Sequence, residues 1–182
     1  MVNYGIFLRG INVNGIKIKM KELTLFLKTL NDDHVKTLGA TGNIILSRAQ
    51  PIEDLSAFKK ALELKLSQHY GYEAFLFIRR EDELKDLLAS AEKLVVAPTD
   101  HIYALFIDET STQEALLETF ETLDHHKDER LLKVNKDLFW CVEKGYTLSS
   151  EFGKKALGNK YFKSKLTSRN LNTIYKVYKA MG

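Results

Sequence analysis

The chain has 182 residues, of which 45% are hydrophobic and 28% are charged, and its formal net charge is +3. This composition is typical of a globular protein of one or two domains, and a chain of this length buries enough surface to fold without disulfides or bound metals. No segment approaches the roughly 20 apolar residues of a membrane-spanning helix, and the first residues lack the basic region of a secretory signal. The single cysteine, Cys141, excludes an internal disulfide, so we expect a protein of the reducing cytosol.

Charge is distributed unevenly along the chain. Residues 144–182 hold nine Lys or Arg and one acidic residue, Glu151, which gives this segment a net charge of +8. The preceding 143 residues hold 18 basic and 23 acidic groups, a net charge of −5. Such asymmetry is typical of a surface that meets an anionic partner, although a basic end can also dock on the chain's own acidic surface.

The first 80 residues predict six elements in the order strand, helix, strand, strand, helix, strand. Tyr4, Ile6 and Leu8 alternate with the residues between them, as in a strand that buries one face. The predicted strands are residues 4–8, 34–38, 43–47 and 73–79, and the predicted helices are residues 20–30 and 51–70. This order is that of the ferredoxin-like plait.

The second half repeats this order with one difference. Its predicted strands are residues 101–108, 130–134 and 138–142, and its predicted helices are residues 111–123, a segment from about residue 150, and residues 167–181. The last of these helices stands where the final strand is expected. We therefore predict an α+β fold with two ferredoxin-like (α/β plait, βαββαβ) halves, residues 1–80 and 101–182, joined by a linker helix and loop at residues 81–100. The second half is degenerate and ends in basic helices.

Residues 9–17 join the first predicted strand to the first helix, and they hold two glycines, two asparagines and two cations. The side chains of Arg9, Asn12 and Lys17, together with backbone N–H groups, are suitable donors to a phosphate or carboxylate. The glycine spacing is neither that of a phosphate-binding P-loop nor that of a dinucleotide fingerprint. The alternative is that the glycines form a tight crossover and the asparagines hydrogen-bond within the loop.

Two further polar motifs lie at predicted element ends. Asn43 follows the turn at residues 39–42, in which glycine supplies a positive φ. Thr167 or Ser168 is a natural N-cap for the last predicted helix, whose first turn favours an anion. Turn formation and helix capping are the alternative explanations for these motifs. The anion-binding candidates of the helix start are Arg169, Asn170 and Asn172.

Lysines and aromatic residues interleave in the basic C-terminal region. Lys160, Lys163 and Lys165 flank Tyr161 in the sequence. Cations beside stacking rings are typical of proteins that bind single-stranded nucleic acid. A second mixture of this kind, at residues 174–181, has helical spacing and favours packing in a core instead.

No residues in the sequence identify a reaction. His125 and His126 are adjacent in a polar loop, and adjacent histidines seldom face one metal ion. The apolar neighbours of Cys141 favour a buried structural thiol over a nucleophile. We therefore expect no metal site and no cofactor, and a non-catalytic protein is favoured over an enzyme.

Three segments carry a resemblance to a known family. They are Leu8-Arg9-Gly10-Ile11-Asn12-Val13 with Gly15 and Met20, then Thr37 with Gly42-Asn43, and finally Arg169-Asn170 with Asn172-Thr173. With these segments the chain resembles the bacterial domain-of-unknown-function family DUF1697. The resemblance implies two α/β-plait halves and a cytosolic bacterial protein, and it brings no activity, cofactor or catalytic residue.

These segments suggest where a ligand would bind. All three are predicted at the ends of helices or strands, so their polar side chains would form a cleft rich in hydrogen-bond donors if they converge where the two halves meet. The first hypothesis for the function is non-catalytic binding of an anionic partner through the basic C-terminal region. This partner would be a nucleic acid, and RNA is favoured over DNA. The second is binding or turnover of a phosphorylated or carboxylated small molecule in the cleft, and the third is a protein–protein adaptor. The plait fold does not decide among them, because it hosts many functions.

Overall fold

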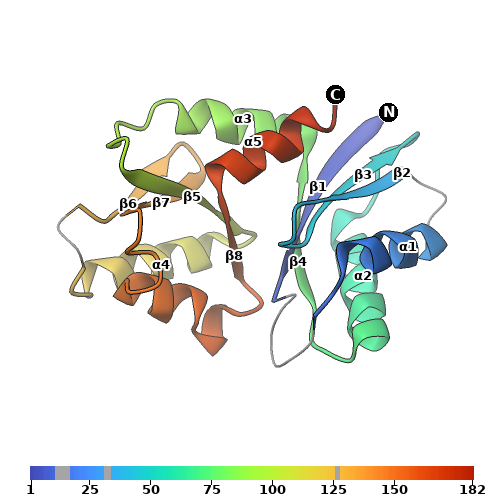
Figure 1. Cartoon of the computed structure of the whole chain (residues 1–182), viewed down its shortest axis with the longest axis horizontal. Coiled ribbons are helices and arrows are strands. Elements are labelled where there is room, and N and C mark those ends of the chain that lie inside the picture. Colours follow the sequence, from blue (N-terminus) through green and yellow to red (C-terminus); the bar gives the residue numbers. More distant parts are fainter. Residues whose placement is uncertain (11–16, 31–33, 126–127) are drawn as a thin grey trace. The chain divides into compact units, whose positions relative to one another are not determined.

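The computed structural model describes residues 1–10, 17–30, 34–125 and 128–182 (Figure 1). These residues form a mixed α+β structure with two four-stranded antiparallel sheets and helices. They divide into two compact units, which we call unit 1 (residues 1–85 and 176–182) and unit 2 (residues 86–175). Each unit contains one of the sheets.

Unit 1 is built on a sheet with the strand order β2-β3-β1-β4. Its two helices, α1 and α2, cover one face of this sheet (Figure 1). The strands are β1 (Val2–Arg9), β2 (His34–Leu38), β3 (Asn43–Arg48) and β4 (Phe75–Arg80), and the helices are α1 (Met20–Leu30) and α2 (Leu55–Tyr70).

The core of unit 1 follows from the alternation seen in the sequence. Tyr4, Ile6 and Leu8 point to the helix side of β1, where they pack with Leu23 of α1 and Leu66 of α2. All five side chains are buried. Burial of such side chains contributes roughly 1.5–3 kcal/mol each, which fixes the register of the strand because a one-residue slip would turn all three out of the core.

The opposite face of the unit 1 sheet meets the end of the chain. A Cβ added at Gly5 would lie 3.0 Å from Cδ1 of Leu84 and 3.2 Å from Cε of Met181. The side-chain amide of Asn3 donates to the backbone carbonyl of Met181 at 3.0 Å, and the Lys36 ammonium donates to that of Ala180. The last residues of the chain are therefore an integral part of unit 1.

Unit 2 is built on a sheet with the strand order β6-β7-β5-β8. Its core contains Trp140 and Phe152, both fully buried, whose ring centroids lie 5.8 Å apart. The strands are β5 (Asp100–Ile107), β6 (Arg130–Val134), β7 (Asp137–Glu143) and β8 (Leu166–Asn170). The helices are α3 (Glu81–Ala91), which starts in unit 1, α4 (Thr110–Glu121), the π-helical turn η1 (Gly153–Leu157), the 3-10 turn η2 (Lys160–Phe162) and α5 (Leu171–Lys179), which ends in unit 1.

The predicted replacement of the last strand by a helix was wrong. Residues 166–170 form β8, which pairs with β5 through Phe106↔Thr167 and Ala104↔Arg169. Burial alternates here in a way that a helix does not produce, since Thr167 and Arg169 are buried on either side of the half-buried Ser168. The polar sequence concealed this short strand, because Thr, Ser and Asn are also the usual capping residues. The second sheet therefore has its fourth strand.

No helix among the described residues combines the length and the apolar character that crossing a membrane requires.

Candidate functional site

Two of the polar motifs lie at the same end of the unit 1 sheet. Arg9 is the last residue of β1 and pairs with Phe75, the first residue of β4. The neighbouring Leu8 donates its backbone N–H to the carbonyl of Gly42 at 2.8 Å, which joins this end of β1 to the turn between β2 and β3. Partial burial lowers the pKa of Arg9 from its ordinary value. Lys17 is exposed, and Asn12 lies outside the described residues.

Asn43 has a structural role in that turn. The residue is fully buried, and its Nδ2 donates to the carbonyl of Leu38 at 3.1 Å and to Oγ1 of Thr41 at 3.0 Å. Gly39 and Gly42 have φ values of 68° and 70°, as a tight turn between strands requires. Both amide hydrogens of Asn43 are thus used within the turn, in agreement with the turn-forming explanation.

The polar residues of β8 are arranged differently from the predicted helix start. Arg169 is a buried strand residue, and its Nη1 donates to the carbonyl of Ser168 at 2.7 Å and to Oγ1 of Thr167 at 3.1 Å. Its burial lowers the pKa of the guanidinium to about 10, so the group keeps its charge at neutral pH. Asn170 takes the capping position instead, because its Oδ1 accepts the backbone N–H of the exposed Asn172 at 3.0 Å.

The predicted cleft stays a prediction. Arg9 and Asn43 belong to unit 1, whereas Arg169, Asn170 and Asn172 belong to unit 2. Within unit 2 the side-chain amide of Asn170 also meets Nδ1 of His101 at 3.3 Å. The residues are therefore gathered into two local groups, one at the end of β1 and one at the end of β8.

Five of the ten lysines in the sequence of unit 2 belong to one irregular segment. We call residues 154–165 the basic segment; it contains five lysines and no acidic residue. Lys160 and Lys163 are exposed, and Lys165 is half-buried with its Nζ 4.0 Å from the centroid of the Tyr161 ring. Tyr161 as a whole residue is 59% exposed. The segment thus presents an accessible aromatic ring beside several cations.

The basic segment is anchored to unit 2 by a buried side chain and a capping hydrogen bond. Phe162 is buried in the unit 2 core, and Asn159 caps the 3-10 turn, because its Oδ1 accepts the backbone N–H of Tyr161 at 2.9 Å. Lys155 lies 3.9 Å from the carboxylate of Glu151, but both side chains are more than half exposed. Such exposed ion pairs contribute less than about 1 kcal/mol, so this lysine remains available to another anion.

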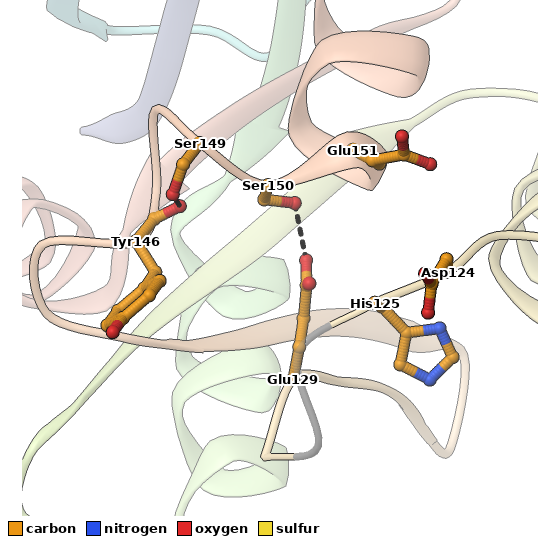
Figure 2. Close-up of a pocket in the computed structure, with 7 residues that line it drawn as sticks. All are labelled: Asp124, His125, Glu129, Tyr146, Ser149, Ser150 and Glu151. Atoms are coloured by element: carbon orange, nitrogen blue, oxygen red, sulfur yellow. Dashed lines mark hydrogen bonds between the residues drawn. The ribbon is translucent and has the colours of Figure 1, made fainter.

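A polar pocket in unit 2 was not foreseen from the sequence. It has a volume of about 290 Å³, and Figure 2 shows Glu129 and Ser150 near the centre of its lining. The residues that line it come from the loop after α4, the residue before β6 and the turns after β7. They are Asp124, His125, Glu129, Tyr146, Ser149, Ser150 and Glu151.

Glu129 is the buried centre of this pocket. It is 3% exposed, and its Oε1 accepts two hydrogen bonds, from Nε1 of Trp140 at 2.8 Å and from Oγ of Ser150 at 2.6 Å. Ser150 in turn accepts the backbone N–H of Gly153 at 2.9 Å, which caps the helical turn that follows. This chain of contacts joins β6, β7 and the start of η1.

Sequence reasoning missed Glu129 because a glutamate in a polar loop is usually solvated. One signal was available in the strand pattern. Leu131 of β6 pairs with Trp140. Glu129 lies two residues before Leu131, so the alternation of the strand puts both side chains on the same face. A carboxylate next to the only tryptophan of the chain is a natural acceptor for its N–H.

Among the residues that the structure describes, metal ligands do not assemble in this pocket. In the described part of the chain, no group of three or more His, Cys, Asp or Glu residues could hold a metal ion. His125 stacks on Phe120 with ring centroids 4.3 Å apart, and His126 lies outside the described residues. Burial raises the pKa of Cys141 to about 11, so its thiol is protonated at neutral pH and is a poor nucleophile.

The comparisons with known proteins agree with the resemblance seen in the sequence. A structure described as that of "conserved bacterial protein SP0830 from Streptococcus pneumoniae" is similar, with a TM-score of 0.73 and 24% sequence identity over 100% of this chain and 98% of that one. At this identity the similarity establishes the fold alone. A search of curated protein sequences found no match. The sequence model of a family described as "Protein of unknown function (DUF1697)" matches residues 1–139. The resemblance is thereby confirmed, and the chain belongs to the DUF1697 family.

Proposed function

We propose that this protein binds single-stranded RNA, without catalysis, through the basic segment of unit 2. The observation that carries this proposal is the exposed ring of Tyr161 with the Lys165 ammonium 4.0 Å from its centroid. Single-stranded nucleic acid binders combine accessible rings, on which bases stack, with cations that follow the phosphates. The absence of acidic residues from position 152 to the end of the sequence supports the same ligand.

The electrostatic part of the proposal rests on lysines of the basic segment. Lys154, Lys155, Lys160 and Lys163 are exposed within a stretch of ten residues. Each lysine that contacts a phosphate of single-stranded RNA releases about 0.7 of a counterion, so the affinity depends steeply on salt. A flexible ammonium is suited to this contact because it needs no fixed geometry.

The stacking part of the proposal rests on Tyr161. Stacking of one base on an aromatic ring contributes roughly 1–3 kcal/mol and is tolerant of sequence. RNA-binding plaits use aromatic residues on their central strands instead, but Phe7 and Phe77 of the unit 1 sheet are fully buried. The proposed binding mode therefore uses the irregular connection before β8 and not the sheet of unit 1.

The test is fluorescence anisotropy with a labelled single-stranded RNA across a salt series. Replacing Lys160, Lys163 and Lys165 by Glu should lower the affinity at least about tenfold and reduce the log–log salt slope by roughly 2, because three phosphate contacts are lost. A matched control replaces the exposed Lys21, Lys60 and Lys65 of unit 1 by Glu, which changes the net charge equally.

The same assay tests the role of the ring. Tyr161→Leu should weaken binding by about tenfold with the salt slope unchanged, since a stacking contact is lost but no ion pair. Tyr175→Leu, at a tyrosine that is 49% exposed on α5, is its control. The proposal is rejected if the triple lysine variant binds as the unmodified protein does, or if the control lysine variant loses as much affinity.

We also propose that each sheet with its helices is a ferredoxin-like plait. Support comes from the strand orders β2-β3-β1-β4 and β6-β7-β5-β8. When the strands of each sheet are numbered along the chain, both orders read second, third, first, fourth. A helix or helical turn follows the first and third strands of each set, as in a βαββαβ unit. A cytosolic bacterial location is part of the same proposal, supported by the single cysteine and by the bacterial source of the similar structure.

A further inference from the structure

The polar pocket of unit 2 carries the opposite charge to the basic segment. Among the described residues, its lining includes the carboxylates of Asp124, Glu129 and Glu151 and no lysine or arginine. The chain as a whole has a net charge of +3, so this concentration of negative charge is local. Carboxylates in a concave surface focus the field and attract small cations from solution.

Glu129 differs from the other acidic residues of this pocket because it is buried. Its side chain is 3% exposed and lines the cavity, and both of its hydrogen bonds go to the same oxygen, Oε1. Within the described residues, Oε2 has no hydrogen-bond donor and the carboxylate has no cationic partner. A buried carboxylate is costly unless it is paired, so a cation in the cavity would stabilise it.

The walls of the pocket complete a site for an ammonium group. His125 meets the backbone carbonyl of Leu123 through Nδ1 at 2.9 Å, and because a carbonyl only accepts, Nδ1 is the donor and Nε2 is the nitrogen that can accept when the ring carries a single proton. Tyr146, which is 45% exposed, offers an aromatic face on another side of the lining (Figure 2). An aromatic ring attracts an organic cation through its negative face.

The separation of the acidic and histidine side chains in the lining favours an organic cation over a single metal ion. In the described part of the chain, the His and acidic side chains do not come close enough in threes to hold a single metal ion. A ligand that reaches several of them must therefore be a few atoms long. A cavity of about 290 Å³ is at the lower end of the range for small-molecule sites.

We infer that the polar pocket binds a small alkylammonium compound, with one ammonium group on Oε2 of Glu129. An ammonium has three donors and no acceptor, and the lining offers carboxylates, a histidine nitrogen and serine hydroxyls as acceptors. This inference does not rest on RNA binding, because none of the lining residues belongs to the basic segment, although Lys155 of that segment lies 3.9 Å from the carboxylate of Glu151.

Trp140 provides a direct readout of the pocket. It is the only tryptophan of the chain, and its indole N–H donates to Glu129, so a cation at this carboxylate should alter its fluorescence. The experiment titrates the full-length protein at low salt with 1,4-diaminobutane and, separately, with the neutral 1,4-butanediol. A saturable fluorescence change with the diamine and none with the diol is the expected result.

Glu129→Gln is the decisive variant. It keeps an oxygen that can accept from both Trp140 and Ser150 but removes the charge, so the association constant for the diamine should fall by about tenfold, as for one lost charge-assisted hydrogen bond. Glu114→Gln, at an exposed residue of α4 outside the lining, is the matched control and should leave binding unchanged. If Glu129→Gln does not fold, Asp124→Asn tests the pocket in its place, with a smaller expected loss.

Four results would overturn the inference. The first is no saturable response to the diamine, and the second is an equal response to the diol. The third is diamine binding that is unchanged in both Glu129→Gln and Asp124→Asn. The fourth is a loss in Glu114→Gln as large as that in Glu129→Gln, which would mean that the diamine binds any acidic surface of the chain.

Discussion

The connection from the third to the fourth strand differs between the two units, although the strand order is the same. In unit 1, residues 49–74 contain α2, a helix of 16 residues that begins at a side-chain cap on Asp54 and ends at Gly71, whose φ is 66°. In unit 2, residues 144–165 contain a π-helical turn of five residues and a 3-10 turn of three. A regular helix is therefore not needed to bring the fourth strand to its place.

The two connections also differ in which side chains they bury and which they leave exposed. The long helix α2 repeats a buried stripe, in which Leu62 and Leu66 face the core. The irregular connection of unit 2 buries isolated anchors instead, Phe152, Ala156 and Phe162. Because short turns bury few side chains, most of the residues between the anchors face solvent, and these include Lys154, Lys155 and Lys160 of the basic segment.

The largest predicted effect is the loss of one such anchor. Phe152→Ala removes a fully buried ring that packs on Trp140 and on Phe120, whose centroid is 5.2 Å away. The free energy of unfolding of unit 2 should fall by about 3–5 kcal/mol, through lost burial and a cavity. Urea unfolding followed by the fluorescence of Trp140 measures this change.

The matched change in unit 1 is Leu66→Ala, which should cost about 2–5 kcal/mol. Far-UV circular dichroism reports both units, whereas the fluorescence of Trp140 reports unit 2. If the anchors act locally, Phe152→Ala lowers the fluorescence midpoint more than Leu66→Ala does. Equal shifts of both signals in both variants would instead mean that the units unfold as one, and the comparison of separate anchors would fail.

The second prediction compares the two caps. Asp54 accepts the backbone N–H of Ala57 and Ser150 accepts that of Gly153, each at 2.9 Å and three residues ahead. Asp54→Ala should cost about 1 kcal/mol, the usual value for an N-cap. Ser150→Ala should cost about 2 kcal/mol, because it also removes a donor from the buried carboxylate of Glu129. Thermal unfolding of both variants checks the order, and an equal cost would mean that the bond to Glu129 adds nothing.

The sequence predicted the regular parts of this fold for physical reasons. The first strand and α2 are long enough for a period of two or of 3.6 to stand out, and the buried face of the first strand was identified in advance. The strand β8 was missed because only five residues form it and four of them are polar. Its position is set by pairing with β5, which lies about 60 residues earlier and leaves no trace in local propensity.

The candidate sites also include features that were visible in the sequence and features that only the fold brings together. Lys160, Lys163 and Tyr161, which are exposed in the structure, were named from the sequence because charge and aromatic spacing are visible there, and their binding role stays a prediction. The role of Asn43 as a turn residue was foreseen for the same reason, since Gly-Asn pairs mark turns. The polar pocket was not foreseen, because the residues from 124 to 151 that line it meet only through the hairpin of β6 and β7.

The smallest predicted effect concerns two ion pairs, one in each connection. Lys59 lies 4.0 Å from Glu63 with side chains 22% and 18% exposed, whereas Lys155 lies 3.9 Å from Glu151 with side chains 59% and 52% exposed. Water screens the second pair more, so Lys155→Gln should change the free energy of unfolding by less than about 0.5 kcal/mol, and Lys59→Gln by up to about 1 kcal/mol. Urea midpoints at low and high salt test this order, since only the more exposed pair should lose its whole contribution in salt. A larger cost for Lys155→Gln would mean that this lysine stabilises the irregular connection, which would leave it less free to bind RNA.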